Sequence, residues 1–449
     1  MREIRVGYSP ITQPIFDKRW AEEMHQRSLS LLRGVSGIRL IEGNGTIMTE
    51  KEAWDAARAF QKGKVDVVLM QSVNSDGGIL ASILGQNSGA PVLLWSTPEP
   101  TLHDTGLRAN SFCGAMIIAA TLRRLHIRYK HLEGFPDDAR FRERLTRSIR
   151  VLGCIAALRE SKLGLIGYQT PGFHHVSFDE ILLRRTFGVG VQHVDLSEVF
   201  SAAQSISKDS VMRTVEEIKR EGVAGKEVVE EDFRKTASIC EGLKDVIRKY
   251  DITASAVKCF PEFWDELRIA PCCALGRIMD EGKMTACEGD MLGALTMLVE
   301  YYLADGPALF VDLISMDDES NSGVVWHCGT GPICMAEDPE KVRYGQHSLF
   351  SPPAGLTREF ACKTGPITCA RISERDGNYC VYAMGGEAVE GDASLRGTSM
   401  KIKYAQPVEK LRRTLFDDGV ENHFAVVYGD IRDQLEDFSK WLGLDSVIL

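Results

Sequence analysis

The sequence predicts an α/β protein with two doubly wound α/β domains followed by a mostly antiparallel β domain at the C-terminus. Its 449 residues exceed the size at which one hydrophobic core keeps growing. Up to residue 283, short apolar runs alternate with helical patterns, which is typical of parallel sheets covered by helices on both faces. Runs of strands then replace this alternation. We therefore expect domains over residues 1–160, 161–283 and 284–449.

The first domain begins with a strand and alternates strands with helical segments. The amphipathic pattern EKEAWDAARAFQKG, over residues 50–63, predicts a helix between the second and third strands. Four short apolar runs predict the strands, at 4–10, 38–43, 66–72 and 91–97. The chain has neither the glycine fingerprint of a dinucleotide-binding fold nor a P-loop motif.

The second domain follows a long helix predicted over residues 141–162, which has mixed charge. LGLIGYQTPGF, at 163–173, predicts a strand and a Gly-Pro turn. The next predicted elements are helices around 178–187, 208–221 and 227–249, a strand at 191–196 and a buried strand at 254–260.

The third domain has a different sequence pattern, in which β-rich segments are separated by glycine turns. Helical signal returns only near residues 429–442. The segments that look like β-hairpins lie at 308–317, 324–329, 358–373 and 378–391. We therefore expect a separate, mostly antiparallel domain.

Charge and hydrophobic patterning argue against several classes of function. The formal net charge is −10 and basic residues are interleaved with acids, so no footprint for a nucleic-acid backbone is visible. The longest apolar stretches, such as AMIIAA at 115–120, are too short to span a membrane. The N-terminus runs into a strand without a signal-peptide pattern. We expect a cytoplasmic protein with no nucleic-acid or membrane partner.

The twelve cysteines do not suggest disulfides, because none lies in a CxxC pair and the chain is large and reads as unsecreted. Cys272 and Cys273 lie on a predicted helix, and Cys287 precedes Glu288. Neither pattern resembles a zinc site. We expect buried, reduced thiols.

Two acidic segments late in the chain are the main functional signal. Glu262, in CFPEFWDEL, follows the buried strand at 254–260, and ligands of open α/β sheets bind at the carboxyl ends of strands. Glu288 and Asp290, in ACEGDML, precede an apolar helix for which Asp290 can serve as N-cap. Carboxylates from separate segments suit a divalent cation and a polyol.

These segments carry a resemblance to a known family. The order of a strand, Glu262, a helix ending in RIMDEG, then CEGD and an apolar helix is similar to the L-arabinose isomerase and L-fucose isomerase superfamily. SKLGLIGYQTPGFHHVSFDE, TGPITCARIS and ENHFAVVYGD resemble those enzymes in kind and order. The resemblance covers residues 150–449 well, and 1–150 only as an α/β domain of the right size.

The resemblance implies a metal-dependent aldose–ketose isomerase. Its metal ligands fall on Glu262, on Glu288 or Asp290, and on His423; the arabinose enzymes place the second ligand on Glu288 and the fucose enzymes place it on Asp290. A mainly oxygen ligand set with one imidazole suits Mn²⁺ or Mg²⁺. Glu262 and Asp290 are assigned to proton transfer through an ene-diol. His327 corresponds loosely to a further histidine of the arabinose enzymes.

Each of these residues also has a structural interpretation. Glu262 can be a solvated acid at a strand end, and Glu288 and Asp290 can form only a helix cap. His423 alone can be a core or loop histidine. Their occurrence together, in the order of the family, favours the metal site.

Four further side chains are candidates for substrate contact. His174 and His175 follow the Gly-Pro turn at a strand end, and Arg108 and Asn110 lie on a turn after the fourth strand. The alternative for the last two is a structural turn. In the resembling enzymes the N-terminal domain closes a neighbour's active site, so we expect a homo-oligomer, hexamer-like by resemblance. Arg108, His174 and His175 are available to a charged substituent on the sugar.

Two other functions remain open on sequence alone. Two α/β domains with a cleft also build non-catalytic sugar-binding or regulatory proteins. A lyase or epimerase that acts on a sugar acid is the other alternative, because a fold does not fix a reaction. The identity of the sugar is not determined by the sequence.

Overall fold

The computed structural model describes residues 3–75, 77–100, 107–349, 352–391 and 395–449. The chain forms two compact units, over residues 1–157 and 158–449. The fold class predicted from the sequence is confirmed, because two parallel sheets with helices precede a mostly antiparallel sheet. The second parallel sheet and the antiparallel sheet belong to the same unit, so the boundary expected at 283 falls inside it.

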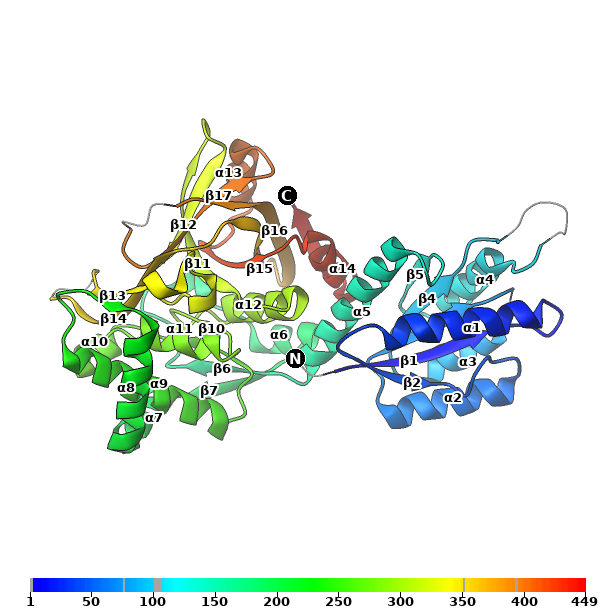
Figure 1. Cartoon of the computed structure of the whole chain (residues 1–449), viewed down its shortest axis with the longest axis horizontal. Helices are drawn as coiled ribbons and strands as arrows, with labels where there is room; N and C mark the ends of the chain where they lie inside the picture. The colour runs from blue at the N-terminus through cyan, green and yellow to red at the C-terminus, as the bar shows by residue number, and fades with distance from the viewer. Residues whose placement is uncertain (1–2, 76, 101–106, 350–351, 392–394) are drawn as a thin grey trace. The chain divides into compact units, whose positions relative to one another are not determined.

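The N-terminal unit is a five-stranded parallel sheet in the order β2-β1-β3-β4-β5 (Figure 1). Its elements are β1 (Ile4–Ile11), α1 (Lys18–Arg33), β2 (Ile38–Glu42), α2 (Glu50–Gly63), β3 (Val67–Ser72), α3 (Ile79–Asn87), β4 (Val92–Ser96), α4 (Ser111–Arg124), β5 (Tyr129–Glu133) and α5 (Ala139–Arg159).

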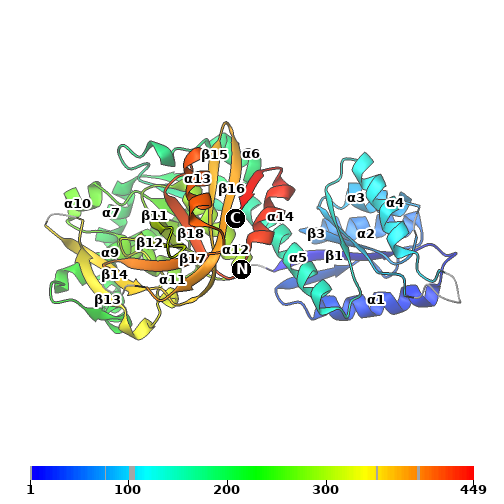
Figure 2. The ribbon, with the colours of Figure 1, turned by 90° about the horizontal axis from the view of Figure 1, so that it is seen from above.

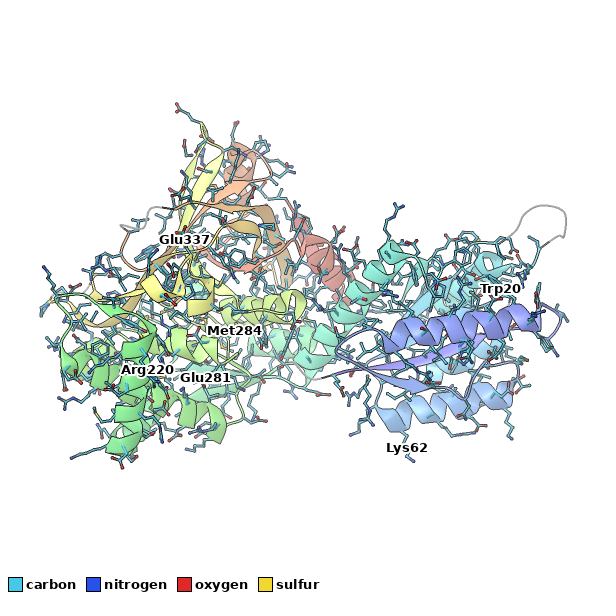
Figure 3. All side chains as sticks on the ribbon, in the orientation of Figure 1. Trp20, Lys62, Arg220, Glu281, Met284 and Glu337 are labelled. Carbon is cyan, nitrogen blue, oxygen red and sulfur yellow. The ribbon has the colours of Figure 1, made fainter. Side chains whose placement is uncertain are left out.

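Helices cover both faces of this sheet because its strands are apolar on both sides. In β4, Val92 and Leu94 point into a cluster with α2, α3 and α4, whereas Trp95 stacks on Phe141 of α5. Successive side chains of a strand alternate between faces, so one short strand supports both layers. α2 presents its charged residues, such as Lys62, to solvent (Figure 3). The predicted doubly wound domain is therefore observed.

The second unit begins with a four-stranded parallel sheet in the order β10-β9-β6-β7. Its elements are β6 (Lys162–Ile166), α6 (Glu180–Phe187), β7 (Gly190–Val194), α7 (Leu196–Ser205), α8 (Lys208–Glu221), β8 (Val223–Ala224), α9 (Glu230–Lys249), β9 (Ala254–Val257), α10 (Glu262–Leu267), α11 (Cys272–Asp280), β10 (Thr285–Ala286) and α12 (Met291–Ala304). β8 pairs with β13 instead, at the edge of the other sheet.

The C-terminal part is a ten-stranded sheet in which six antiparallel strands close into a barrel. Its elements are β11 (Leu309–Asp317), β12 (Ser322–His327), β13 (Arg343–His347), β14 (Ala354–Ala361), β15 (Gly365–Arg375), β16 (Asn378–Val389), β17 (Thr398–Tyr404), α13 (Val408–Asp417), β18 (His423–Tyr428), α14 (Arg432–Leu442) and β19 (Asp445–Ile448). β17 pairs with both β12 and β16, so the ring β16-β15-β18-β11-β12-β17 has no free edge (Figure 2).

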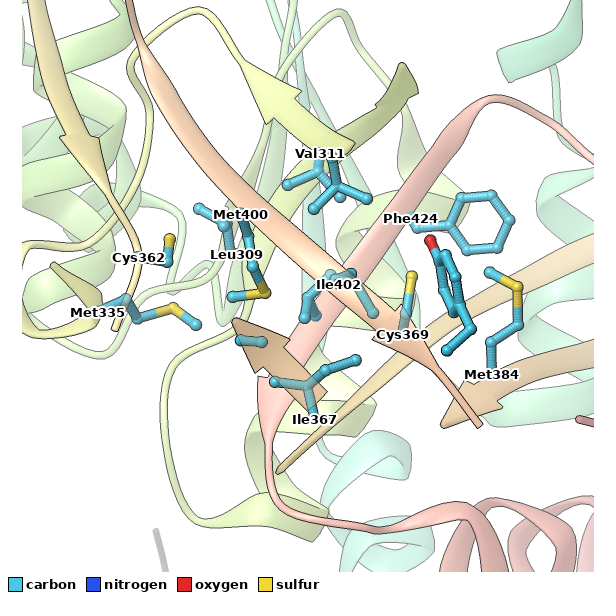
Figure 4. Close-up of a cluster of buried hydrophobic side chains, with 14 of the residues drawn as sticks. Leu309, Val311, Met335, Cys362, Ile367, Cys369, Met384, Met400, Ile402 and Phe424 are labelled. Carbon is cyan, nitrogen blue, oxygen red and sulfur yellow. The ribbon is translucent and has the colours of Figure 1, made fainter. Parts of the chain in front are cut away.

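The barrel is filled by apolar side chains that alternate along its strands (Figure 4). Leu309 and Val311 of β11 and Phe424 of β18 point into this core. Phe310, between Leu309 and Val311, and His423, next to Phe424, point to the other face, where their rings lie 4.8 Å apart. The same alternation that fills the barrel therefore delivers polar groups to its outside.

Two local expectations are wrong. Helical signal was expected only near 429–442, but the barrel core also contains Val408, Leu411 and Leu415 of α13. This helix is short and its polar face dominates its sequence. Segment 358–373 is not a hairpin, because β14 pairs with β13 and β17 whereas β15 pairs with β16 and β18.

Helix α12 joins the two sheets of the second unit, because it contacts β9 and β6 on one side and β15 and β18 on the other (Figure 1). Both sides are apolar, which explains why the helix is apolar all round and almost entirely buried. No helix in the described part of the chain has the length and apolar character needed to cross a membrane.

Glu300 is the exception within α12. Its side chain is fully buried, and neither carboxyl oxygen has a hydrogen-bond partner among the described residues. Burial raises the pKa of Glu300 well above its ordinary value of 4.5, because the interior disfavours the charged form. The folded state therefore holds this proton more tightly than the unfolded state does.

This burial predicts that Glu300 destabilises the fold increasingly as the pH rises above the unfolded pKa. We expect Glu300→Met to raise the free energy of unfolding by about 1–3 kcal/mol near pH 8, since it removes an unsatisfied buried polar group. Between about pH 5 and 8 the stability of the variant should fall less than that of the wild type. Thermal unfolding followed by circular dichroism across this pH range checks both statements. Glu300→Gln, which keeps the shape and removes the titration, should flatten the pH dependence equally; an unchanged pH dependence in both variants would contradict the prediction.

Candidate active site

The turn Glu288-Gly289-Asp290 places two carboxylates between β10 and α12. Glu288 and Gly289 have φ values of 63° and 75°, in the left-handed region. A Cβ on Gly289 would lie 2.3 Å from the carbonyl oxygen of Tyr168, so only glycine fits against the loop after β6. The Gly289 N–H donates to the carbonyl of Val257 at the end of β9. The turn therefore sits at the carboxyl edge of the parallel sheet.

Asp290 is a fully buried carboxylate whose two oxygens are both used. Oδ1 accepts from the N–H of Gly293 at 2.7 Å and caps α12, as expected from the sequence. Oδ2 accepts from Arg371 Nη1 at 2.6 Å and contacts His423 Nδ1 at 2.9 Å. Burial alone would raise the pKa of Asp290, but the charge of Arg371 and the hydrogen bond from His423 hold it well below its usual range. Asp290 thus stays charged and fixes the imidazole of His423.

His423 is fully buried and begins β18, directly opposite Asp312 of β11 in the antiparallel register. Its Nε2 lies 2.9 Å from Glu288 Oε2 and 3.5 Å from Asp312 Oδ1. Burial opposes a charge on His423, but its hydrogen bond to Asp290 and the nearby carboxylate of Glu288 raise its pKa to about 9. The structure therefore brings together Glu288, Asp290 and His423 of the predicted set.

The group around His423 Nε2 has the donors that a divalent cation requires. Nε2 lies close to Glu288 Oε2 but has no hydrogen-bond partner of acceptable geometry among the described residues. Two ligands of an octahedral ion with bonds of about 2.1 Å lie about 3.0 Å apart, which matches the 2.9 Å separation. Metal-binding histidines typically hydrogen-bond a carboxylate through the ring nitrogen that does not bind the metal, and Asp290 is placed to do this at Nδ1. Glu288, Asp312 and His423 therefore fit a hard divalent ion.

His327 ends β12 and is almost fully buried, in the same group as Asp312 and His423: one ligand atom from each lies within 4.8 Å of the others. Its Nδ1 accepts the N–H of Cys328 at 2.9 Å, so the hydrogen of the neutral ring is on Nε2. Nε2 has no hydrogen-bond partner among the described residues. A nitrogen that carries hydrogen cannot ligate a metal, so His327 suits hydrogen bonding to a sugar oxygen better than metal binding.

Glu262 begins α10, just past the carboxyl end of β9, and its Oε1 accepts from Lys258 Nζ. Its Oε2 has no hydrogen-bond partner among the described residues. A cavity of about 580 Å³ opens here, at the ends of β6 and β7. The residues that line it include Gly167, Tyr168, Asp195, Glu262 and Glu266. Glu262 thus shares the sheet edge with the Glu288 turn, while its observed ion pair is with Lys258.

The two histidines after β6 differ in placement. The ring centroid of His175 is 5.9 Å from that of His423, so His175 belongs to the site. Partial burial, and then the nearby positive charge of His423, lower the pKa of His175, so it is neutral near pH 7. His174 is exposed.

Arg108 and Asn110 lie in the N-terminal unit. Arg108 pairs with Asp17 at 3.0 Å and stacks over Trp20, and its side chain is 39% exposed. The backbone N–H groups of Arg108 and Asn110 both donate to the carboxylate of Glu99. Glu99 therefore holds the backbone of residues 108–110, where Arg108 presents a half-exposed guanidinium.

Sequence reasoning missed three charged side chains of the site. Asp312 and Arg371 each interrupt an apolar strand, in ALFVDLISMD and PITCARIS, and Lys258 ends the strand before Glu262. A charge inside a strand that is otherwise buried is the signal that could have identified the first two, because such a charge needs a partner.

Comparisons with known proteins agree on one family. Residues 9–159 match the model of the fucose/sulfoquinovose isomerase N-terminal domain, and residues 326–449 match that of the L-fucose isomerase C-terminal domain. A sulfoquinovose isomerase from Priestia megaterium is 31% identical over 450 residues, covering 100% of both chains. A sulfoquinovose isomerase from Alkalicoccus urumqiensis is 28% identical over 99% of both.

More distant matches give less information about the family of this chain. An L-arabinose isomerase from Geobacillus thermodenitrificans is 22% identical over 73% of this chain and 68% of its own. Among solved structures, a periplasmic solute-binding protein from Actinobacillus succinogenes with bound D-allose covers 68% of this chain and 92% of its own, with 10% identity and a TM-score of 0.19, which is too low to indicate a shared fold.

The contacts of His423 predict how its titration responds to mutation. In metal-free protein we expect NMR titration of His423 to give a pKa of about 9. Asp290→Asn should lower this pKa, because it removes the negative charge that favours the imidazolium. Asp318→Asn, which removes a carboxylate paired with Arg412 on the surface, is the control and should leave His423 unchanged. An identical His423 titration in the Asp290 variant would show that this carboxylate does not set the state of the ring.

Proposed function

This chain belongs to the fucose/arabinose isomerase superfamily and is an aldose–ketose isomerase, and we propose that its substrate is the sulfonated sugar sulfoquinovose, turned over with a divalent metal ion. The substrate proposal is supported by the relatives that align over the whole chain, which carry that name. The L-arabinose isomerase aligns over only part of it.

The observation that carries the metal proposal is the environment of His423. Asp290 holds Nδ1, so Nε2 is directed at Glu288 and Asp312. These three residues would hold Mn²⁺ or Mg²⁺, because carboxylate oxygens with one imidazole suit such ions. When bound, the ion supplies positive charge that stabilises the negative charge developing on the oxygens of C1 and C2 of the sugar.

Isomerisation moves one proton from C2 to C1 and one from the C2 hydroxyl to the C1 oxygen. Glu262 is a candidate for one transfer at carbon, because Lys258 occupies Oε1 and Oε2 has no hydrogen-bond partner among the residues that the structure describes. For the second transfer, sequence reasoning prefers Asp290. The oxygens of Asp290 are already hydrogen-bonded to Gly293, Arg371 and His423. We therefore assign the second proton transfer to Glu288, and Asp290 to positioning His423.

The remaining candidates would orient the sugar. The Nε2–H of His327 is a buried donor available to a hydroxyl, and His175 lies at the rim of the site. The sulfonate requires a cation, for which Arg108 is the candidate, supplied by the N-terminal unit of another subunit in a hexamer-like homo-oligomer. Asn110 and His174 are candidates for further hydroxyl contacts.

The substrate and metal proposals are tested together by NMR. Sulfoquinovose, L-fucose, L-arabinose and D-glucose are each incubated with enzyme and Mn²⁺, and aldose-to-ketose conversion is measured. We expect kcat/KM for sulfoquinovose to exceed that for the uncharged sugars by about 100-fold or more, as a site built for a polar group discriminates strongly. Chelation should abolish activity and Mn²⁺ should restore it. Faster turnover of an uncharged sugar would refute the substrate proposal, and full activity with no metal by elemental analysis would refute the metal proposal.

The roles of the acids are separated by neutral variants. Glu262→Gln and Glu288→Gln should each lower kcat by roughly 100-fold to 10,000-fold, with saturating Mn²⁺ failing to restore the rate. His423→Gln should act mainly through metal affinity, so excess Mn²⁺ should recover part of its activity. Asp290→Asn should resemble His423→Gln if Asp290 is a positioning residue.

The Asp290 variant decides between the two alignments of the Glu288-Gly289-Asp290 turn. A loss of activity in Asp290→Asn that Mn²⁺ does not relieve, with a nearly normal Glu288→Gln, would assign proton transfer to Asp290. Glu319→Gln, on the exposed turn between β11 and β12, is the matched control and should keep wild-type rates.

A further inference from the structure

A second group of metal-binding side chains lies apart from the hard donors around His423. The Sγ atoms of Cys272 and Cys328 are 3.7 Å apart. Together with one ring nitrogen of His347, their ligand atoms all lie within 4.8 Å of one another. Cys272 and His347 are 1% and 5% exposed and Cys328 is half-buried, so most of this cluster is shielded from solvent.

Three elements that are distant in sequence produce this cluster. Cys272 is the first residue of α11, Cys328 directly follows β12, and His347 ends β13. The thiol of Cys287 also hydrogen-bonds with Cys328 and with Cys259, so two more sulfur atoms adjoin the group.

We propose that Cys272, Cys328 and His347 bind a zinc ion. A tetrahedral ion with Zn–S bonds of about 2.3 Å holds two sulfurs about 3.8 Å apart, which matches the observed 3.7 Å. Two thiolates and an imidazole form a soft donor set, and such sets select zinc over Mn²⁺ or Mg²⁺. Cys287 is the candidate for the fourth position, because its thiol already contacts Cys328.

The zinc ion would support the substrate-binding histidine. Cys328 Sγ lies 3.2 Å from His327 Nδ1, and the Cys328 N–H donates to the same nitrogen. Fixing Cys328 to α11 and to the end of β13 therefore fixes the residue that orients the ring of His327. The ion would also cross-link the helical layer of the second unit to its antiparallel sheet.

The test uses the full-length protein, purified without a metal-affinity tag from medium that contains zinc and Mn²⁺, and dialysed against a chelating resin. Elemental analysis should find about one zinc per chain that resists this treatment, as buried zinc sites do. Protein loaded with Co²⁺ in place of zinc should show thiolate-to-cobalt charge-transfer absorption. This spectrum is a property of the wild type and so does not depend on whether a variant folds.

Single substitutions of the three proposed ligands test which residues bind the zinc ion. Cys272→Ser, Cys328→Ser and His347→Gln should each lower zinc affinity by tenfold or more and remove or weaken the cobalt band. Cys240→Ser, which replaces a buried thiol of α9, is the matched control and should retain both. Glu288→Gln should keep the zinc, which separates this site from the one proposed for catalysis.

Two results would overturn the proposal. One is wild-type protein that holds no zinc after purification and gives no thiolate band with Co²⁺. The other is a Cys272–Cys328 disulfide, found by mass spectrometry of protein purified without reductant, since it would assign the close sulfurs to redox chemistry instead.

Discussion

The Asp290 carboxylate connects the helix, the barrel and the site of this protein. It caps α12, pairs with Arg371 of β15 and holds His423 of β18, and all three side chains are fully buried. A buried charge is expensive unless it is paired, so each partner depends on the other two. Removing Asp290 would take from Arg371 and His423 the carboxylate that they share at the junction of the parallel sheet and the barrel. The geometry around His423 is therefore fixed by the same interaction that docks the two layers.

The two layers contribute different chemistry. The carboxyl edge of the parallel sheet contributes Glu262, at the start of α10, and Glu288, on the turn before α12. The barrel contributes Asp312 and His423, which are held in register on neighbouring strands. A closed barrel has no edge to fray, so these two side chains sit on a rigid support. Carboxylates at a helix start and on a turn, beside an imidazole on a rigid strand, suit a site that moves protons while the position of His423 stays fixed.

Local sequence patterns predicted the parts of the fold that are local. The alternation of strands and helices identified both parallel sheets, and the apolar run after Asp290 identified α12 and its cap. Closure of the barrel depends on pairing of β17 with β12 and β16, which no local periodicity encodes. For the same reason Asp312 was missed: it becomes significant only because the register sets it opposite His423. Colinearity with a known family singled out the acids as candidates, and the contacts of Asp290 are what favour Glu288 over it in the proposed proton transfer.

The end of β12 shows how the chain separates two kinds of donor within two residues. The ring of His327 lies in the same group as Asp312 and His423, whereas the thiol of the next residue, Cys328, faces Cys272. An oxygen- and nitrogen-rich group and a sulfur-rich group therefore adjoin each other at the end of β12. Hard ions prefer the first donor set and soft ions the second. The imidazole of His327 therefore belongs to the first group and also contacts the second, through Cys328.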